Sequence, residues 1–221
     1  MTKTGTGPLV EYELNGEIVT LTLNRPQKLN AFNDELVGAL SDALHRFDMD
    51  DSAQIAVLTG RGRAFSSGAD VNQRQLRSRE EFLRLGGPQG RGTHSADLLT
   101  KAVNWKPVIA APHGYVLGLS VGIVFECELV VAEEGTRFQI TETSRGLGAG
   151  RYWGLMHFRG GGSFTMEAAL TGRFFTAEEA LAANLVNRVA PKGRHLEYAY
   201  ELAHEVIENA VGHVFIENAV V

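Results

Sequence analysis

The chain has 221 residues, of which 44% are hydrophobic and 21% are charged, and its formal net charge at pH 7 is −5. This length suits one sizeable domain with its own core, and the acidic balance argues against general affinity for nucleic acid. The sequence has no apolar run of about 18 residues that could span a bilayer, and no signal or transit pattern. Its single cysteine, Cys127, excludes an internal disulfide. We therefore expect a cytoplasmic protein with no nucleic-acid or membrane partner.

The first part of the chain predicts strands separated by a helix. Residues 17–24 alternate apolar and polar side chains, as in a strand with one buried face. Asn33 is a suitable N-cap for a helix, and the apolar residues after it recur at helical spacing. These residues are Leu36, Leu40, Ala43, Leu44 and Phe47. A second apolar run at 54–59 predicts another buried strand, so the order strand, helix, strand indicates an α/β architecture.

Two glycine-rich turns stand out after apolar runs. The stretch 106–122, KPVIAAPHGYVLGLSVG, begins as a buried strand and continues after His113–Gly114 into a predicted helix at 118–127. The start of such a helix offers free backbone N–H groups. An earlier strand ends in a similar turn, Phe65-Ser-Ser-Gly-Ala-Asp70. Alone, small residues at these points could simply allow close packing of a helix on a sheet.

The second half of the chain predicts further short elements and no linker that would divide it. Strands are expected at 128–132 and 136–140, and helices at 163–170, 176–183 and 191–210. The glycines at 146–150 resemble a dinucleotide-binding fingerprint. We reject such a site because no hydrophobic strand precedes it and the glycine spacing is incomplete.

Three motifs, in order and in register, resemble the crotonase superfamily, also called the enoyl-CoA hydratase/isomerase family. The family pattern reads FxxGAD, then KPVIAAxxGxxxGGG, then ARFGxPE. Here these motifs stand at Phe65–Asp70, Lys106–Gly118 and Arg137–Glu142. The resemblance runs from about Glu17 to Lys192, and three motifs together make it specific to the superfamily, though not to one reaction.

The resemblance implies an α/β fold, a crotonase-like ββα spiral over 1–190 followed by a C-terminal helical segment over 191–221. In relatives, additional C-terminal helices cover the acyl pocket and build trimers. This chain stops soon after the predicted 191–210 helix, so this lid is either absent or not represented in the sequence. A homotrimer or hexamer is therefore implied by the family and weakened by the short C-terminus.

The resemblance also implies an oxyanion hole made from backbone groups. When a thioester loses its α-proton, negative charge develops on its oxygen, and preorganised N–H donors stabilise that charge. By similarity, the donors are the N–H groups of Ala69 and Leu119. Leu119 replaces the middle glycine of the family's GGG, but the backbone donor does not depend on the side chain.

In relatives, the loop at RPxxxNA, residues 25–31 here, lies along the adenosine end of coenzyme A. Its residues are therefore candidate coenzyme A contacts, although an ordinary strand–helix connection would have the same pattern. Asp70 could instead cap the next helix. The candidate coenzyme A contacts are Lys28, Asn30, Ala31, Ser67, Gly68, Asp70 and Gly118.

One departure from the family concerns the acid/base groups. Family hydratases carry two glutamates, of which the second matches Glu142, whereas the first falls on Gly122. A syn hydration needs one group to activate water and another to move the α-proton, but a double-bond shift needs only one base. Glu142-Thr143 also resembles the glutamate site of the Δ3,Δ2-enoyl-CoA isomerases. Glu126, one helical turn after Gly122, could replace the lost carboxylate, although a structural acid paired with an arginine is favoured.

Several other residues permit two interpretations. Tyr152, Trp153 and Phe158 are expected to form an aromatic cluster, either in the core or lining the acyl pocket. His113 is interpreted as a turn residue and Glu128 as a structural acid. No cluster has the spacing of metal ligands.

Taken together, these patterns predict an acyl-CoA-binding enzyme that stabilises a thioester enolate and uses Glu142 as its single acid/base. Enoyl-CoA double-bond isomerisation is the leading prediction. The alternatives are an enoyl-CoA hydratase or dehydratase that uses one glutamate, and a non-catalytic CoA-ester-binding subunit. Coenzyme A enters as part of the substrate, so neither a separate cofactor nor a metal is expected.

Overall fold

The computed structural model describes residues 7–72, 78, 80, 106–146 and 150–209. The strands are β1 (Val10–Asn15), β2 (Ile18–Leu23), β3 (Ile55–Gly60), β4 (Val108–Ala110), β5 (Tyr115–Leu117), β6 (Leu129–Glu133), β7 (Arg137–Gln139), β8 (Phe175–Thr176) and β9 (Arg188–Ala190). The α-helices are α1 (Asp34–Met49), α4 (Leu119–Glu126), α5 (Gly150–Met156), α6 (Gly162–Thr171), α7 (Ala177–Ala182) and α8 (His195–Asn209). Shorter helical segments are η1 (Pro26–Lys28), η5 (Thr143–Arg145) and η6 (His157–Gly161).

The larger sheet has the strand order β1-β2-β3-β4-β6-β9, and the smaller sheet has the order β5-β7-β8. Among the described strands of the larger sheet, β1 and β2 pair in antiparallel fashion and the other neighbours are parallel. All six residues of β3 are buried, as expected for a parallel strand that is covered on both faces.

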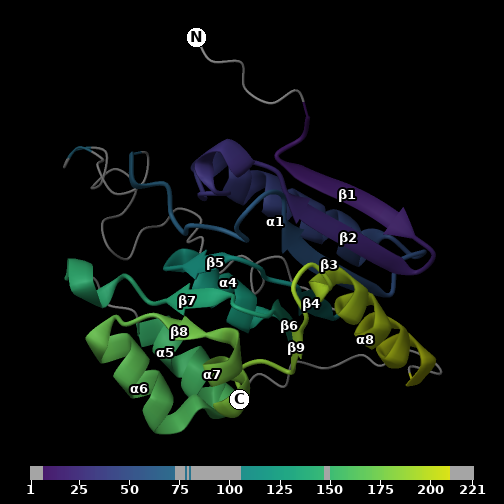
Figure 1. The fold of residues 1–221 in the computed structure, drawn as a ribbon. Coiled ribbons are helices and arrows are strands. Elements are labelled where there is room, and N and C mark those ends of the chain that lie inside the picture. The colour runs from purple at the N-terminus through teal and green to yellow at the C-terminus, as the bar shows by residue number, and fades with distance from the viewer. Residues whose placement is uncertain (1–6, 73–77, 79, 81–105, 147–149, 210–221) are drawn as a thin grey trace.

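Helices cover both faces of the larger sheet (Figure 1). Side chains alternate along a strand, so Leu58 of β3 joins Leu40 of α1 in one apolar cluster, whereas Val57 joins Leu202 of α8 in another. Cys127 is fully buried in the first cluster and fills part of the core. None of the described helices is both long enough and apolar enough to cross a membrane.

The two sheets are linked by a repeated strand–strand–helix unit. The chain leaves β4, forms β5 in the smaller sheet and continues into α4, and β6 is followed in the same way by β7 and then by η5. Figure 1 shows β5, β7 and β8 stacked beside the larger sheet, with α5, α6 and α7 below them. This repetition confirms the predicted ββα spiral.

Some predicted elements differ from the observed ones. The last helix begins at His195 rather than at residue 191, because a turn precedes it in which the Arg194 N–H donates to the Pro191 carbonyl (2.9 Å). The predicted aromatic cluster is wrong in one member. Phe158 is 92% exposed, whereas Tyr152 and Trp153 pack against the core.

Candidate active site

The turn at Phe65–Asp70 is held by the loop that follows β2. The Phe32 N–H donates to the Gly68 carbonyl (2.8 Å), and the Asp70 N–H donates to the Phe32 carbonyl (2.9 Å). Arg25 and Asp70 form an ion pair of 2.7 Å whose side chains are only 15% and 13% exposed. The Ser66 hydroxyl accepts from the Gly68 N–H (3.0 Å). These bonds fix the backbone of the turn.

Asn30 stabilises the same loop from inside. Its side chain is fully buried and its φ angle is 51°. Its amide accepts from the Arg25 N–H (2.8 Å) and donates to the carbonyls of Arg61 (3.0 Å) and Ala64 (2.9 Å). The amide is therefore used within the protein, while Lys28 of the same loop is exposed. The coenzyme A contacts predicted for this loop, including Ala31, remain predictions.

The turn lies directly against the start of α4. Ser66 and Val116 form a parallel bridge, and the Leu117 N–H donates to the Ser66 carbonyl (3.1 Å). Gly68 has a φ angle of +86°, and a methyl group placed on it would lie 2.4 Å from the Leu117 oxygen and 3.4 Å from the Leu119 nitrogen. Only glycine permits this close approach.

Two backbone N–H groups are available at this contact. Leu119 is the first residue of α4, where N–H groups have no partner inside the helix. Among the described residues, no hydrogen bond is made by the N–H of Leu119 or by that of Ala69. Gly118 before the helix has φ 53° and ψ −121° and donates its N–H to the Gln139 carbonyl (2.9 Å). The turn and the helix start thus bring two free donors to one place.

Glu142 reaches the same place from the neighbouring strand. Leu117 of β5 is paired with Gln139 of β7, so the segments after these two parallel strands run side by side. A methyl group on Gly118 would lie 3.0 Å from Oε1 of Glu142 and 2.7 Å from Oγ1 of Thr141. The Glu142 carboxylate therefore lies against the N-terminus of α4, where the helix dipole favours negative charge.

Burial makes this carboxyl group less acidic than usual. Desolvation raises the pKa of Glu142 above its ordinary value, more than the backbone hydrogen bonds and the charge of Arg145 lower it. Oε2 of Glu142 is buried and accepts no hydrogen bond from the described residues. A carboxylate in such surroundings is a stronger base than one in water.

Gly122 lies one helical turn after Gly118, at the position of the first glutamate of the family pattern. A methyl group there would lie 2.4 Å from Cε1 and 2.6 Å from Cδ1 of Tyr152. Tyr152 belongs to α5 and is 8% exposed. The sequence suggested Tyr152 only as one of several aromatic residues, although the glycine at 122 is the signal that points to a large neighbour.

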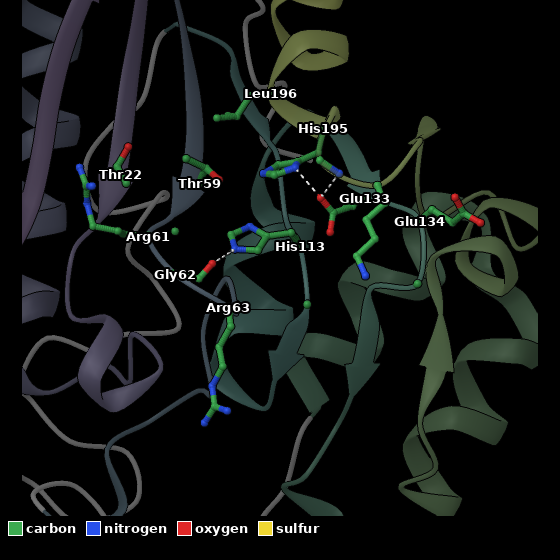
Figure 2. A pocket seen from close by; sticks show the side chains of 15 residues that line it. Thr22, Thr59, Arg61, Gly62, Arg63, His113, Glu133, Glu134, His195 and Leu196 are labelled. Carbon is green, nitrogen blue, oxygen red and sulfur yellow. Dashed lines mark hydrogen bonds and ion pairs between the residues drawn. The ribbon is translucent and has the colours of Figure 1, made fainter.

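A cleft with a volume of about 980 Å³ lies at the C-terminal ends of β3, β4 and β6, and Gly68, Leu119 and Glu142 are not among the residues that line it. In Figure 2 the rings of His113 and His195 face each other, with centroids 4.8 Å apart, and Glu133 accepts from Nδ1 of His195 (3.0 Å). His113 donates from Nε2 to the Gly62 carbonyl (2.9 Å), so it is a buried residue that anchors this turn.

Glu128 has the structural role that we expected. Its carboxylate accepts from the Val108 N–H (2.8 Å) and thereby joins β4 to the segment after α4. Within the described part of the chain, no three His, Cys, Asp or Glu side chains are placed to hold a metal ion.

The structure therefore brings together Gly68, Ala69, Gly118, Leu119 and Glu142, and it places Ser67 and Asp70 in the same turn. Two free backbone donors beside a half-buried carboxylate can stabilise an oxyanion while a proton is moved. The fold and the site define an α/β protein of the ββα-spiral class whose site contains the groups that proton transfer requires.

Comparison with known proteins gives the family. The sequence model described as "Enoyl-CoA hydratase/isomerase" matches residues 13–219. The 2,3-dehydroadipyl-CoA hydratase of Escherichia coli is 35% identical over 195 residues, which cover 87% of this chain and 73% of that protein. The crystal structure of an enoyl-CoA hydratase from Mycobacterium tuberculosis superposes with a TM-score of 0.79 at 32% identity, covering 91% of this chain and 76% of that one. The chain belongs to the enoyl-CoA hydratase/isomerase family, the crotonase superfamily, and is an enzyme of that family.

Proposed function

We propose that this enzyme shifts the double bond of an enoyl-CoA, with Glu142 as its single acid/base. One observation carries the proposal. Among the described residues, one carboxylate lies at the start of α4, while position 122 of the helix is a glycine covered by an aromatic ring. Moving a double bond requires one group that takes a proton and returns it, whereas hydration requires a second group to activate water.

The proposed reaction balances with the residues of this site. The Glu142 carboxylate removes the α-proton of a β,γ-enoyl thioester, and the electrons of that C–H bond pass into the conjugated enolate. The N–H groups of Ala69 and Leu119 donate to the thioester oxygen, where the negative charge collects. Protonated Glu142 then delivers the proton to the γ-carbon, which leaves an α,β-enoyl thioester and restores the carboxylate.

Hydration is the second candidate. It is favoured by the names of the relatives and of the solved structures, most of which are called hydratases. With a single glutamate, the same carboxyl group would have to activate water and also deliver a proton to the α-carbon. Both reactions pass through a thioester enolate that the same two donors can stabilise, and they differ in what happens at the β- and γ-carbons.

Coenzyme A would enter as part of the substrate. We propose that the exposed Lys28 and the backbone of the Asn30–Ala31 loop meet its nucleotide end, since this loop is bonded to the turn that carries Ala69. Assembly into a trimer or hexamer and a cytoplasmic location are further proposals that follow from the family and the composition.

The test of the proposed function is hydrogen exchange at the α-carbon. A panel of saturated and unsaturated acyl-CoAs is incubated with the enzyme in deuterated water and followed by mass spectrometry and NMR. We expect deuterium to enter the α-carbon, and unsaturated substrates to give isomers with a shifted double bond. If no thioester exchanges although acyl-CoAs bind measurably, the non-catalytic alternative is correct and the proposal is wrong.

The pH profile should report the raised pKa of Glu142. The carboxylate must be ionised to accept the α-proton, and its pKa is raised above the ordinary 4.5, chiefly by burial. We therefore expect kcat/KM to fall on acidification through an inflection above pH 4.5, with full activity on the alkaline side, because kcat/KM follows the ionisation of the free enzyme. Circular dichroism over the same range separates this fall from unfolding. A profile that stays flat down to pH 4.5 would contradict the assignment.

A further inference from the structure

Two glycines lie where α4 borders the site, and each is covered by a different side chain. Gly118 is the N-cap residue before α4, and Gly122 is the fourth residue of the helix. Glu142 lies over the first glycine, where a methyl group would be 3.0 Å from Oε1. Tyr152 lies over the second, where a methyl group would be 2.4 Å from Cε1 and 3.3 Å from Cζ.

These distances make Gly122 and the Tyr152 ring mutually dependent. No real Cβ atom approaches another heavy atom this closely, so a side chain at position 122 and the ring cannot occupy their present positions together. The ring is also held firmly. Tyr152 is 8% exposed, and Met156 and Trp153 of the same helix pack against the core that includes Val121.

The neighbouring residues show what the ring replaces. A carboxylate on the α4 face at position 122 would stand beside Glu142, and a pair of carboxylates can hold a water molecule by hydrogen bonds. An aromatic ring in that volume excludes water from it. The ring therefore occupies the volume into which a side chain at position 122 would extend.

We infer that Tyr152 determines the outcome of the reaction by filling the space above Gly122 and excluding water from the β-carbon of the bound thioester. The inference rests on the proposed function, because it concerns the thioester that Glu142 acts on. With the ring in place, the proton goes to the γ-carbon, the double bond moves, and the α,β-enoyl thioester is released. Without the ring, water can add to that α,β-enoyl thioester: its oxygen bonds to the β-carbon, the electrons of the double bond pass into an enolate, and a proton returned to the α-carbon gives a 3-hydroxyacyl-CoA.

The packing of the pair can be tested by thermal unfolding. Gly38 in α1 provides a matched control, because a methyl group there would meet nothing within 4 Å. We expect Gly38→Ala to keep or raise Tm, since alanine favours a helix, and Gly122→Ala to lower Tm by several degrees. In a Tyr152→Ala background, Gly122→Ala should cost less, because the clash is gone. Equal losses in both backgrounds would overturn the pairing.

The decisive readout is the product ratio. Wild type, Tyr152→Phe, Tyr152→Leu and Tyr152→Ala are each given the same enoyl-CoA, and the hydrated and isomerised products are separated by liquid chromatography. We expect Tyr152→Phe to retain the wild-type ratio, because the ring remains. Tyr152→Ala should raise the hydrated fraction by about tenfold, which corresponds to about 1.4 kcal/mol in relative barrier height. Gly122→Glu combined with Tyr152→Ala should raise it further. Tyr152→Leu removes the ring but keeps an apolar side chain in the core. It takes the place of Tyr152→Ala in this test if the alanine variant does not fold.

The possible failures can be told apart. Suppose that the wild type exchanges α-protons in a Glu142-dependent manner, but that Tyr152→Leu and Tyr152→Ala give the same product ratio as the wild type. The inference is then wrong and the proposed function stands. A change in Tyr152→Phe as large as that in Tyr152→Ala would also overturn it, because the hydroxyl and not the ring would then matter. If the wild type shows no exchange, the proposed function fails, and the inference fails with it.

Discussion

Replacing Glu142 by glutamine should lower kcat by about 10³-fold, within the range usual for the loss of a general acid/base, while acyl-CoA binding changes little. Glutamine has nearly the same shape as glutamate, but its amide cannot take the α-proton. The carboxylate lies against Gly118, and its Oε2 atom is buried, so solvent cannot easily replace it. The measurements are kcat from steady-state kinetics and the Kd of a saturated acyl-CoA from calorimetry.

Glu128→Gln is the matched control for this variant. Glu128 is also a carboxyl group whose pKa is raised, chiefly by burial, but it bonds to the Val108 N–H and not to the site. We expect it to lower stability and to leave kcat within a few-fold of wild type. Glu142→Gln should not lose stability at pH 7, because burial penalises the ionised form of Glu142 in the folded protein. Near-normal turnover of Glu142→Gln would remove Glu142 from the mechanism.

Local sequence patterns predicted the elements that position the site. The apolar run of β3 and the Asn33 cap of α1, which accepts from the Leu36 N–H, are both in the structure. The motifs at Phe65–Asp70 and Lys106–Gly118 contain short-range turn and helix-start signals, so a few neighbouring residues determine their backbone geometry. The turn and the helix start could therefore be located from local signals, whereas the assignment of Ala69 and Leu119 as the donors came from the resemblance to the family.

The features that the sequence did not reveal depend on packing between distant segments. Helix α5 contains Gly150 and Gly154, and because glycine disfavours helices, its pattern gave no helix signal. The ring of Tyr152 fills the space above Gly122 only because α5 packs on α4. Asn30 looked like a ligand contact in its loop motif, but its amide binds carbonyl groups more than 30 residues away. Such contacts become visible only when the chain is folded.

Replacing Gly68 by alanine is the second change with a large expected effect, and it tests the backbone donors themselves. The new methyl group would lie 2.4 Å from the Leu117 oxygen and 3.4 Å from the Leu119 nitrogen. Since the contacting atoms are backbone, relief requires the turn and the start of α4 to move apart. Two donors that no longer converge cannot both reach one oxygen, and the loss of one such donor typically costs about 10²–10³-fold in kcat. We expect a fall in kcat of about 10²-fold, measured with the same enoyl-CoA.

Gly16→Ala separates this effect from simple backbone strain. Gly16, in the turn between β1 and β2, also has a positive φ angle (+61°), but a methyl group there would meet nothing within 4 Å. Both variants should lose about 1 kcal/mol of stability from the unfavourable backbone conformation. Gly68→Ala should lose more because of its contact with the Leu117 oxygen, and only Gly68→Ala should also lose activity. Because the side chains of Ala69, Leu119 and Glu142 are unchanged in both, a selective loss in Gly68→Ala would have to come from the spacing of the two backbone segments. Equal activity in the two variants would instead show that turnover does not depend on that spacing, and the proposed oxyanion hole would be wrong.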